Sequence, residues 1–168
     1  PKVSGDIKRI GSKNKMENSG WQHRMKKSDD IITKIQKESL ENGWNIDEVI
    51  TKDLRDTVRY TYIVDDVTYV DDVLRALNDL ESSGYELKKL SNYWGGKDYK
   101  GLNCAFREKT TGRMIEVQFN TNTSQYVKDT FSHKLYAQIR RVGISASEKS
   151  RLQAEMRRHW ETVTPPSG

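Results

Sequence analysis

The sequence is poor in the residues that cross-link small folds or bind metal ions. It has one cysteine, Cys104, and three histidines among 168 residues. A single cysteine excludes an intrachain disulfide framework and a zinc site built on several thiolates. The histidines have no metal-ligand spacing, which argues against a hydrolase with a histidine-based metal site. A Walker loop, a Ser-His-Asp arrangement and a nucleophilic-cysteine motif are also missing from the sequence.

Long hydrophobic runs are missing too. No apolar run approaches the roughly 20 residues that span a membrane, and no signal peptide is visible, so we expect no membrane partner. Hydrophobic residues make up 34% of the chain and charged residues 32%, which indicates a polar protein with a modest core. The net charge of +5 and the isoelectric point of about 9.2 suit a polyanionic ligand such as a nucleotide or RNA, although many basic proteins bind neither.

What the chain does contain predicts a single domain. Four tryptophans, eight tyrosines and several periodic segments argue against disorder. Residues 1–20 are rich in Lys, Ser, Asn and Gly and poorly periodic, so we expect a flexible arm or linker there, with or without a short helix. Residues 21–164 form the predicted domain, and residues 165–168 form a frayed C-terminus.

The hydrophobic pattern changes several times between helical and strand-like periods. Helices are predicted at residues 25–39, 67–80, 127–139 and 145–160. Strands are predicted at residues 60–64, 85–94, 102–107 and 114–119, with a hairpin turn at residues 109–112. The predicted inward stripe of the second helix is Val67, Val70, Val73, Leu74, Leu77 and Leu80. This order predicts an α/β fold of the α+β type, in which helices cover a mixed sheet of four to five strands.

Polar and apolar residues alternate in the predicted strand at residues 114–119. Ile115, Val117 and Phe119 share one face, which we expect to meet the core, whereas Glu116 and Gln118 share the other. The polar face is either a solvated outer surface or the floor of a cleft in which a carboxylate and an amide meet a ligand or a metal ion.

A basic loop precedes this hairpin. Lys97, Tyr99 and Lys100 lie among three glycines. Lysines supply positive charge for phosphate, and an aromatic ring can stack on a base. The pattern predicts either a nucleotide-binding loop or an ordinary solvated turn.

A basic segment lies near the N-terminal end of the first predicted helix. It contains Arg24, Lys26 and Lys34. Several cations oppose the helix dipole there unless an anion compensates them, and helix N-termini also bind phosphate through free N–H groups. The segment is either a triphosphate cradle or an exposed basic helix.

Charged residues also precede the predicted strand at residues 60–64. Asp53 or Asp56 could hold Mg²⁺ through oxygen, and Arg59 could reach a phosphate. The alternative is a surface cluster of salt bridges. His133 falls off the apolar stripe of its predicted helix and could face the same cleft.

Several motifs, taken in order, resemble those of the RelA/SpoT-type alarmone synthetases over roughly residues 20–140. The motifs are RMKKSDDIITK, RDTVRYTYIV, GKDYKGLN, IEVQFNT and SHKLYAQIR. The combination of a Lys-x-Tyr loop followed closely by a Glu-x-Gln strand is the most specific part. The resemblance implies a RelA/SpoT nucleotidyltransferase-like fold. It also implies transfer of pyrophosphate from ATP to the 3′-hydroxyl of a purine nucleotide, with release of AMP.

The resemblance assigns roles to individual residues. It implies that ATP is bound by Arg24, Lys26, Lys34 and Arg59. It implies catalysis by Asp56, Glu116 and Gln118, where Asp56 and Glu116 hold Mg²⁺ and Asp53 is a rival to Asp56. It implies that the acceptor is bound by Lys97, Tyr99, Lys100, Asn103 and His133.

The acceptor loop departs from the family pattern. The family usually has glycine before the loop tyrosine, then serine and histidine two and four residues after it. This chain has Asp98, Gly101 and Asn103 at those positions. The product is therefore left open between (p)ppApp and (p)ppGpp, with pyrophosphorylation of the tRNA 3′ end as an alternative. A rival of another class is a non-catalytic module that binds nucleotides or RNA.

The hydrolase half of the family is missing, and the chain starts at Pro1 rather than Met. Both features resemble the toxin branch of the family. That resemblance implies a growth-inhibiting domain of a larger secreted or phage-borne protein that acts in the bacterial cytoplasm of a target cell. It also implies a cognate immunity protein or antitoxin as a partner.

Overall fold

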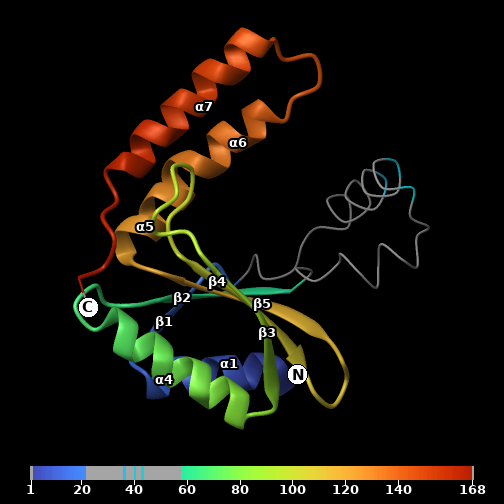
Figure 1. Ribbon diagram of the computed structural model, residues 1–168, viewed down its shortest axis with the longest axis vertical. Coiled ribbons are helices and arrows are strands. Elements are labelled where there is room, and N and C mark those ends of the chain that lie inside the picture. The colour runs from blue at the N-terminus through green and yellow to red at the C-terminus, as the bar shows by residue number, and fades with distance from the viewer. Residues whose placement is uncertain (1, 22–35, 37–39, 41–42, 44–57, 168) are drawn as a thin grey trace.

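The computed structural model describes residues 2–21, 36, 40, 43 and 58–167, and in them a five-stranded sheet forms the centre of the molecule (Figure 1). The strands are β1 (Glu17–Ser19), β2 (Arg59–Ile63), β3 (Tyr85–Asn92), β4 (Leu102–Glu108) and β5 (Met114–Asn120). Their order across the sheet is β1-β2-β5-β4-β3. β2 and β5 are parallel, and the other neighbours are antiparallel. The predicted mixed sheet is confirmed.

Two helices, α1 (Lys2–Lys13) and α4 (Tyr69–Ser82), lie against one face of this sheet (Figure 1). Alternate residues of β5 meet them, because Ile115, Val117 and Phe119 are fully buried. This is the core face that the alternation in the sequence predicts. Gly84 ends the segment after α4 with a φ of +94°, a conformation that favours glycine.

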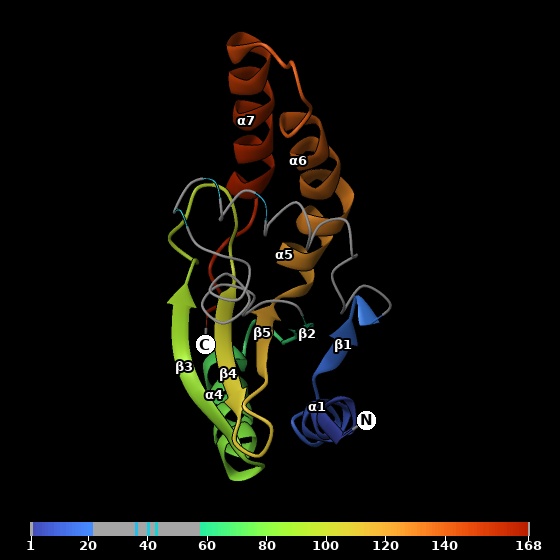
Figure 2. The ribbon, with the colours of Figure 1, turned by 90° about the vertical axis from the view of Figure 1, so that its right-hand side faces the viewer.

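The remaining helices rise from the opposite side of the sheet. α5 (Asn122–Val127) continues through a π-helical segment, η3 (Lys128–Ser132), into α6 (His133–Ile139). α7 (Ala146–Glu161) packs beside α6 (Figure 2), and its first turn is capped by the Ser145 hydroxyl, which accepts from the Glu148 amide at 3.2 Å. A second, smaller core of Leu135, Ile139 and Leu152 joins these two helices.

The expectation of a flexible arm over residues 1–20 is wrong. This segment contains α1 and β1, and β1 pairs with β2 at the edge of the sheet. Ile7 and Ile10 are fully buried, and the Tyr62 hydroxyl donates to the Ile7 carbonyl oxygen at 2.6 Å. The two isoleucines supply the helical apolar stripe, but the surrounding lysines, serines and glycines hide it in the composition.

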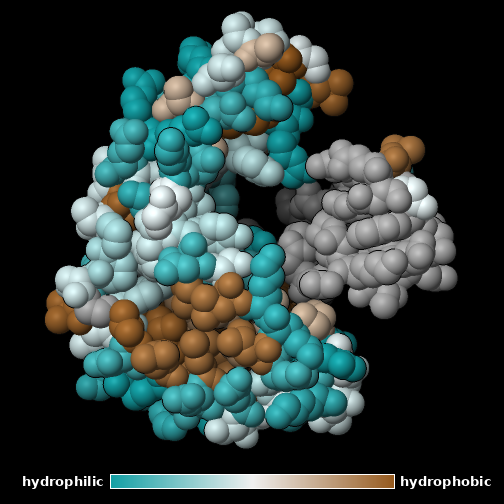
Figure 3. All heavy atoms as spheres, viewed as in Figure 1, coloured by the Kyte–Doolittle hydropathy of each residue, from teal (hydrophilic) through white to brown (hydrophobic). Residues whose placement is uncertain are grey.

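The inward stripe predicted for the second helix is wrong in part. α4 buries Tyr69, Val73, Ala76 and Leu80. Val67, Val70 and Leu74 are instead 71%, 51% and 53% exposed, and Figure 3 shows an apolar patch over this part of the surface. Tyr69 explains the difference: its hydroxyl donates to the Phe119 carbonyl oxygen at 2.7 Å and lies 3.2 Å from the indole nitrogen of Trp94. Tyr69 is thus buried where its neighbour Val70 was predicted to be, whereas Val73 and Leu80 are buried as predicted.

The predicted helix at residues 25–39 falls almost wholly outside the described residues. Within the part of the chain that is described, no helix is long and apolar enough to cross a membrane.

Candidate functional site

The face of the sheet that α1 and α4 leave uncovered carries the polar side chains of the central strands. Glu116 and Gln118 lie on this face of β5, as the alternation predicts. Gln118 is 4% exposed and Asn120 is fully buried, so the interpretation of a solvated outer surface is wrong. Buried amides need hydrogen-bond partners, and each of these has several.

Strand register places the polar side chains in two rows across the sheet. One row runs from Lys89 through Ala105 and Glu116 to Arg59. The next row runs from Ser91 through Asn103 and Gln118 to Thr61. Residues paired across neighbouring strands lie on the same face, so the β2–β5 pairing fixes the arginine beside the carboxylate.

The two rows are linked by a chain of contacts at their centre. Arg59 Nε lies 2.8 Å from Glu116 Oε1, and Gln118 Nε2 donates to the same oxygen at 2.9 Å. Lys128 Nζ donates to Gln118 Oε1 at 2.6 Å. Oε2 of Glu116 accepts no hydrogen bond from the described residues. One carboxylate oxygen is therefore oriented by its neighbours while the other is available to a ligand.

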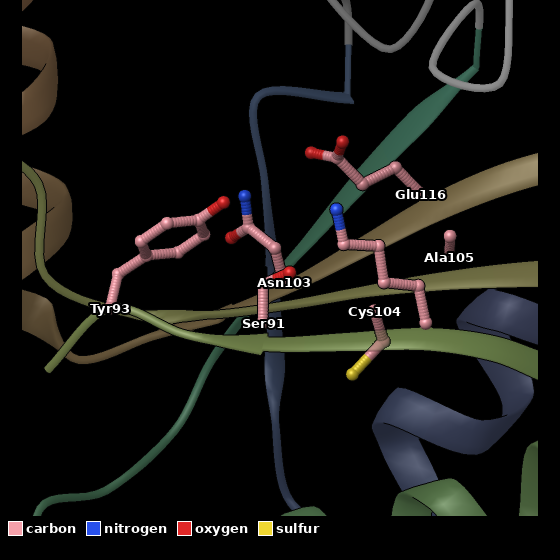
Figure 4. Close-up of a pocket in the computed structure, with 7 residues that line it drawn as sticks. Ser91, Tyr93, Asn103, Cys104, Ala105 and Glu116 are labelled. Carbon is pink, nitrogen blue, oxygen red and sulfur yellow. The ribbon is translucent and has the colours of Figure 1, made fainter. Parts of the chain in front are cut away.

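A cavity of about 110 Å³ lies on one side of Glu116 (Figure 4). It is lined by Lys89, Ser91, Tyr93, Asn103, Cys104, Ala105 and Glu116. Figure 4 shows Tyr93, Asn103 and Glu116 converging on the same space, while the sulfur of Cys104 points away from it. Burial raises the pKa of the Cys104 thiol to about 12, so this group is no nucleophile at neutral pH.

A second cavity, of about 190 Å³, lies on the other side of Glu116 and begins at Arg59. It is lined by Gly20, Arg59, Thr61, Gln125, Lys128, Asp129 and His133. Burial, and after it the nearby Arg59, lower the pKa of Lys128 to about 8, against the opposing effects of Asp129 and Glu116. The two cavities therefore share the Arg59–Glu116 pair as their common wall.

The loop between β3 and β4 is held by α7 and the segment that follows it. The ring of Tyr99 packs edge-on against Trp160, with centroids 5.5 Å apart. Lys100 Nζ donates to the Val163 carbonyl oxygen at 2.5 Å, and Arg157 Nε contacts Asp98 Oδ1 at 2.8 Å. Three successive loop residues are thus tied to the C-terminal part of the chain.

Tyr99 is turned toward the interior of this loop. Its hydroxyl donates to Asn120 Oδ1 at 2.6 Å and lies 3.0 Å from Asn103 Oδ1, and burial raises its pKa. A Cβ atom on Gly101 would lie 2.4 Å from the same hydroxyl oxygen. The serine of the family that the sequence resembles therefore has no room here, because the tyrosine fills that space.

The structure brings together part of the predicted site. Glu116, Gln118, Arg59 and Asn103 form one connected group on the open face. His133 lines the second cavity, apart from Asn103 in the first. Lys97 and Lys100 line neither cavity. Arg24, Lys26, Lys34, Asp53 and Asp56 lie outside the described residues.

Sequence reasoning missed Lys128, Tyr93 and Lys89, which line the cavities. A signal for Lys128 was available. Gln125, Asp129 and His133 repeat every four residues, which marks a polar helix face, and Lys128 lies beside that face.

The donor set for a metal ion is only partly visible. No group of three or more His, Cys, Asp or Glu side chains comes together among the residues that the structure describes. Glu116 supplies one free carboxylate oxygen, a ligand type that suits Mg²⁺. This fits a site in which magnesium has few protein ligands and takes the rest from water and phosphate.

Comparisons with known proteins identify the fold. No family model matches the sequence, and no curated protein sequence matches it. Solved structures do match. The small alarmone synthetase 1 from Bacillus subtilis bound to its product pppGpp aligns with a TM-score of 0.63 at 16% identity, over 95% of this chain and 84% of that one.

Two other solved structures align with this chain over a similar length. A GTP pyrophosphokinase family protein from Streptococcus pneumoniae aligns with a TM-score of 0.60 at 18% identity, over 95% of this chain and 79% of that one. The Bacillus subtilis small alarmone synthetase 1 bound to AMPCPP aligns with a TM-score of 0.55 at 17% identity, over 95% and 83% of the two chains. The chain has the fold of the small alarmone synthetases.

Proposed function

We propose that this protein transfers pyrophosphate from ATP to the 3′-hydroxyl of a purine nucleotide, which yields AMP and (p)ppApp or (p)ppGpp. The observation that carries the proposal is the position of Glu116, a partly buried carboxylate with one free oxygen in the wall between two polar cavities. A two-substrate transfer needs such a group between its substrates. The fold supports the same activity, since the similar structures include a synthetase bound to pppGpp and one bound to AMPCPP.

The transfer needs no covalent intermediate with the protein. The acceptor 3′-oxygen forms a bond to the β-phosphorus of ATP, the bond from that phosphorus to the α–β bridging oxygen breaks, and AMP leaves. The 3′-hydroxyl proton passes to Oε2 of Glu116. Catalysis of this kind rests on positioning and on neutralising charge. Gln118 and Arg59 serve the first purpose, because both fix Oε1 and so aim Oε2.

The two cavities suit different substrates. Arg59 and Lys128 make the second cavity the more cationic one, so it is assigned to the phosphates of ATP, together with Arg24, Lys26 and Lys34. The first cavity, with the polar tip of Asn103 and the exposed ring of Tyr93, is assigned to the acceptor. Mg²⁺, held by Glu116 and Asp56, would neutralise phosphate charge.

The biological role is part of the proposal and rests on the sequence resemblance. The domain would inhibit growth by consuming ATP in the bacterial cytoplasm, and a cognate immunity protein would protect the producing cell. Induced expression in a bacterium should arrest growth, and Glu116→Gln should relieve the arrest. Arrest by the variant at equal protein levels would contradict the role.

The activity is tested by incubating the purified chain with ATP, Mg²⁺ and one of GDP, GTP, ADP or tRNA. AMP and the pyrophosphorylated product are then measured by mass spectrometry. Glu116→Gln should lower AMP release on the order of 10²-fold or more. Glu81→Gln, an exposed glutamate on α4, should leave it unchanged.

Each outcome of this experiment has a distinct meaning. Removal of Mg²⁺ with EDTA should stop AMP release, and added Mg²⁺ should restore it. Product on tRNA alone would favour the tRNA 3′ end as the acceptor. Nucleotide binding without AMP release in any mixture would leave a non-catalytic binding module and overturn the proposed transfer.

A further inference from the structure

Lys128 occupies an unusual position in the helix that follows β5. It is the first residue of the π-helical segment η3, which interrupts the α-helical path between α5 and α6. A π-helical turn contains one residue more than the surrounding pattern allows, and such turns are frequent at functional sites. Here the turn carries the ammonium group to Gln118 Oε1, at 2.6 Å. The helix thereby delivers a cation to the polar row beside Glu116.

No carboxylate of the described part of the chain forms an ion pair with this cation. Lys128 forms no ion pair there, and its hydrogen-bond partner is a neutral amide. The nearby carboxylates are engaged elsewhere: Asp129 accepts from Gln125 at 2.8 Å, and Glu116 contacts Arg59. Burial of a charge is costly without a partner of opposite sign. The positive charge of Lys128 therefore has no ion-pair partner among the described residues, and a bound anion would supply one.

The cavity beside Lys128 has the charge and the size for an anion. Arg59 and Lys128 line it together with one carboxylate, Asp129, and the nearby positive charge of Arg59 lowers the pKa of Lys128. Two cations that disfavour each other are stabilised together by an anion between them. The cavity volume of about 190 Å³ is several times the share of about 30 Å³ that one water molecule occupies in the liquid. A phosphate group meets both requirements.

We propose that Lys128 is a catalytic residue whose ammonium contacts the non-bridging oxygens of the pyrophosphoryl group that is transferred. The inference rests on the proposed function and extends it to a residue that no sequence motif marks. Gln118 connects the two charged groups, because its amide nitrogen donates to Glu116 and its amide oxygen accepts from Lys128. The proton acceptor and the phosphate contact are thus set at a fixed separation by one side chain.

The test compares ligands that differ only in their phosphates. The α,β-methylene analogue of ATP keeps the terminal phosphates and cannot react, whereas AMP lacks them. Loss of a charged hydrogen bond should weaken binding of the analogue to Lys128→Met by about 10- to 100-fold. Binding of AMP should change by less than about twofold, and Lys128→Arg should recover part of the affinity for the analogue. Lys149→Met, on exposed α7, is the matched control.

The outcomes separate this inference from the proposed function. If Lys128→Met binds the analogue as the unchanged chain does, or if it weakens AMP and the analogue equally, Lys128 is structural and the inference is wrong. If the unchanged chain neither binds the analogue nor releases AMP, the proposed function itself fails. Thermal melts of Lys128→Met and Lys128→Gln show which variant is folded, and the comparison is made on that one.

Discussion

The fit of Tyr99 over Gly101 gives a prediction whose magnitude follows from the structure. A Cβ atom at position 101 would lie 2.4 Å from the Tyr99 hydroxyl oxygen and 2.5 Å from Asn120 Oδ1. Both distances are far shorter than real Cβ contacts, so Gly101→Ala must displace the side chains of Tyr99 and Asn120. Overpacking of this kind costs about 1–3 kcal/mol, and loss of the Tyr99–Asn120 hydrogen bond adds about 0.5–1.5 kcal/mol.

Gly101→Ala should therefore lower the free energy of unfolding by about 2–4 kcal/mol. For a chain of this size that corresponds to a fall in melting temperature of about 4–16 °C, measured by circular dichroism. Tyr99→Phe removes the oxygen that the new methyl group would strike. In the double variant the two changes should cost less than the sum of their separate effects.

Two results would refute this reasoning. One is a Gly101→Ala variant as stable as the unchanged chain, which would mean that the loop relaxes without cost. The other is strict additivity of the two substitutions, which would mean that the methyl group and the tyrosine hydroxyl do not compete for space. Gly95→Ala is the matched control, since a Cβ atom there meets nothing within 4 Å.

Two further predictions concern ionisable groups. Hydrogen bonds from the side chain and backbone of Thr111, and from Thr110, hold the pKa of Glu108 at about 2. The stability that the Glu108 carboxylate contributes should therefore be present above about pH 4.5 and be lost as the pH falls toward 2. Glu108→Gln should melt at a lower temperature at pH 7 and show a flatter profile between pH 5 and 2; parallel profiles would contradict this. Lys128 is charged below its pKa of about 8 and faces Arg59, Asp129, Glu116 and His133, so affinity for the ATP analogue should fall as the pH rises above about 8. Lys128→Arg should lack that fall, and an equal fall in both proteins would assign it to another group.

Period-two alternation was sufficient to predict the site-bearing strand. In the segment from Ile115 to Asn120 apolar and polar residues alternate without interruption, and burial of one face leaves no freedom in the orientation of Glu116 and Gln118. The predicted sheet follows from such local patterns, whereas Asn103 was singled out only by the family resemblance.

Other parts of the site depend on contacts between distant segments, which no local pattern encodes. Tyr99 turns inward because its ring packs against Trp160 and its hydroxyl donates to Asn120. These two residues lie 61 and 21 positions later in the chain. α1 was missed because two isoleucines suffice to bury a helix against Tyr62 when the sheet supplies the rest of the core. The polar helix face of Gln125, Asp129 and His133 marks the neighbourhood of Lys128, but the direction of its side chain depends on a π-helical turn, and the register change of that turn is not visible in the residue types.

The contacts of α7 with the loop between β3 and β4 set an order of assembly during synthesis. Trp160 and Val163 emerge from the ribosome long after β3, β4 and β5, yet the loop takes its packing from Trp160 and one hydrogen bond from Val163. A nascent chain can therefore complete the sheet while the Tyr99 loop still lacks its anchor. The ring of Tyr99 packs against Tyr93 in the wall of the first cavity, so this side of the cavity is expected to become ordered only after α7 has formed.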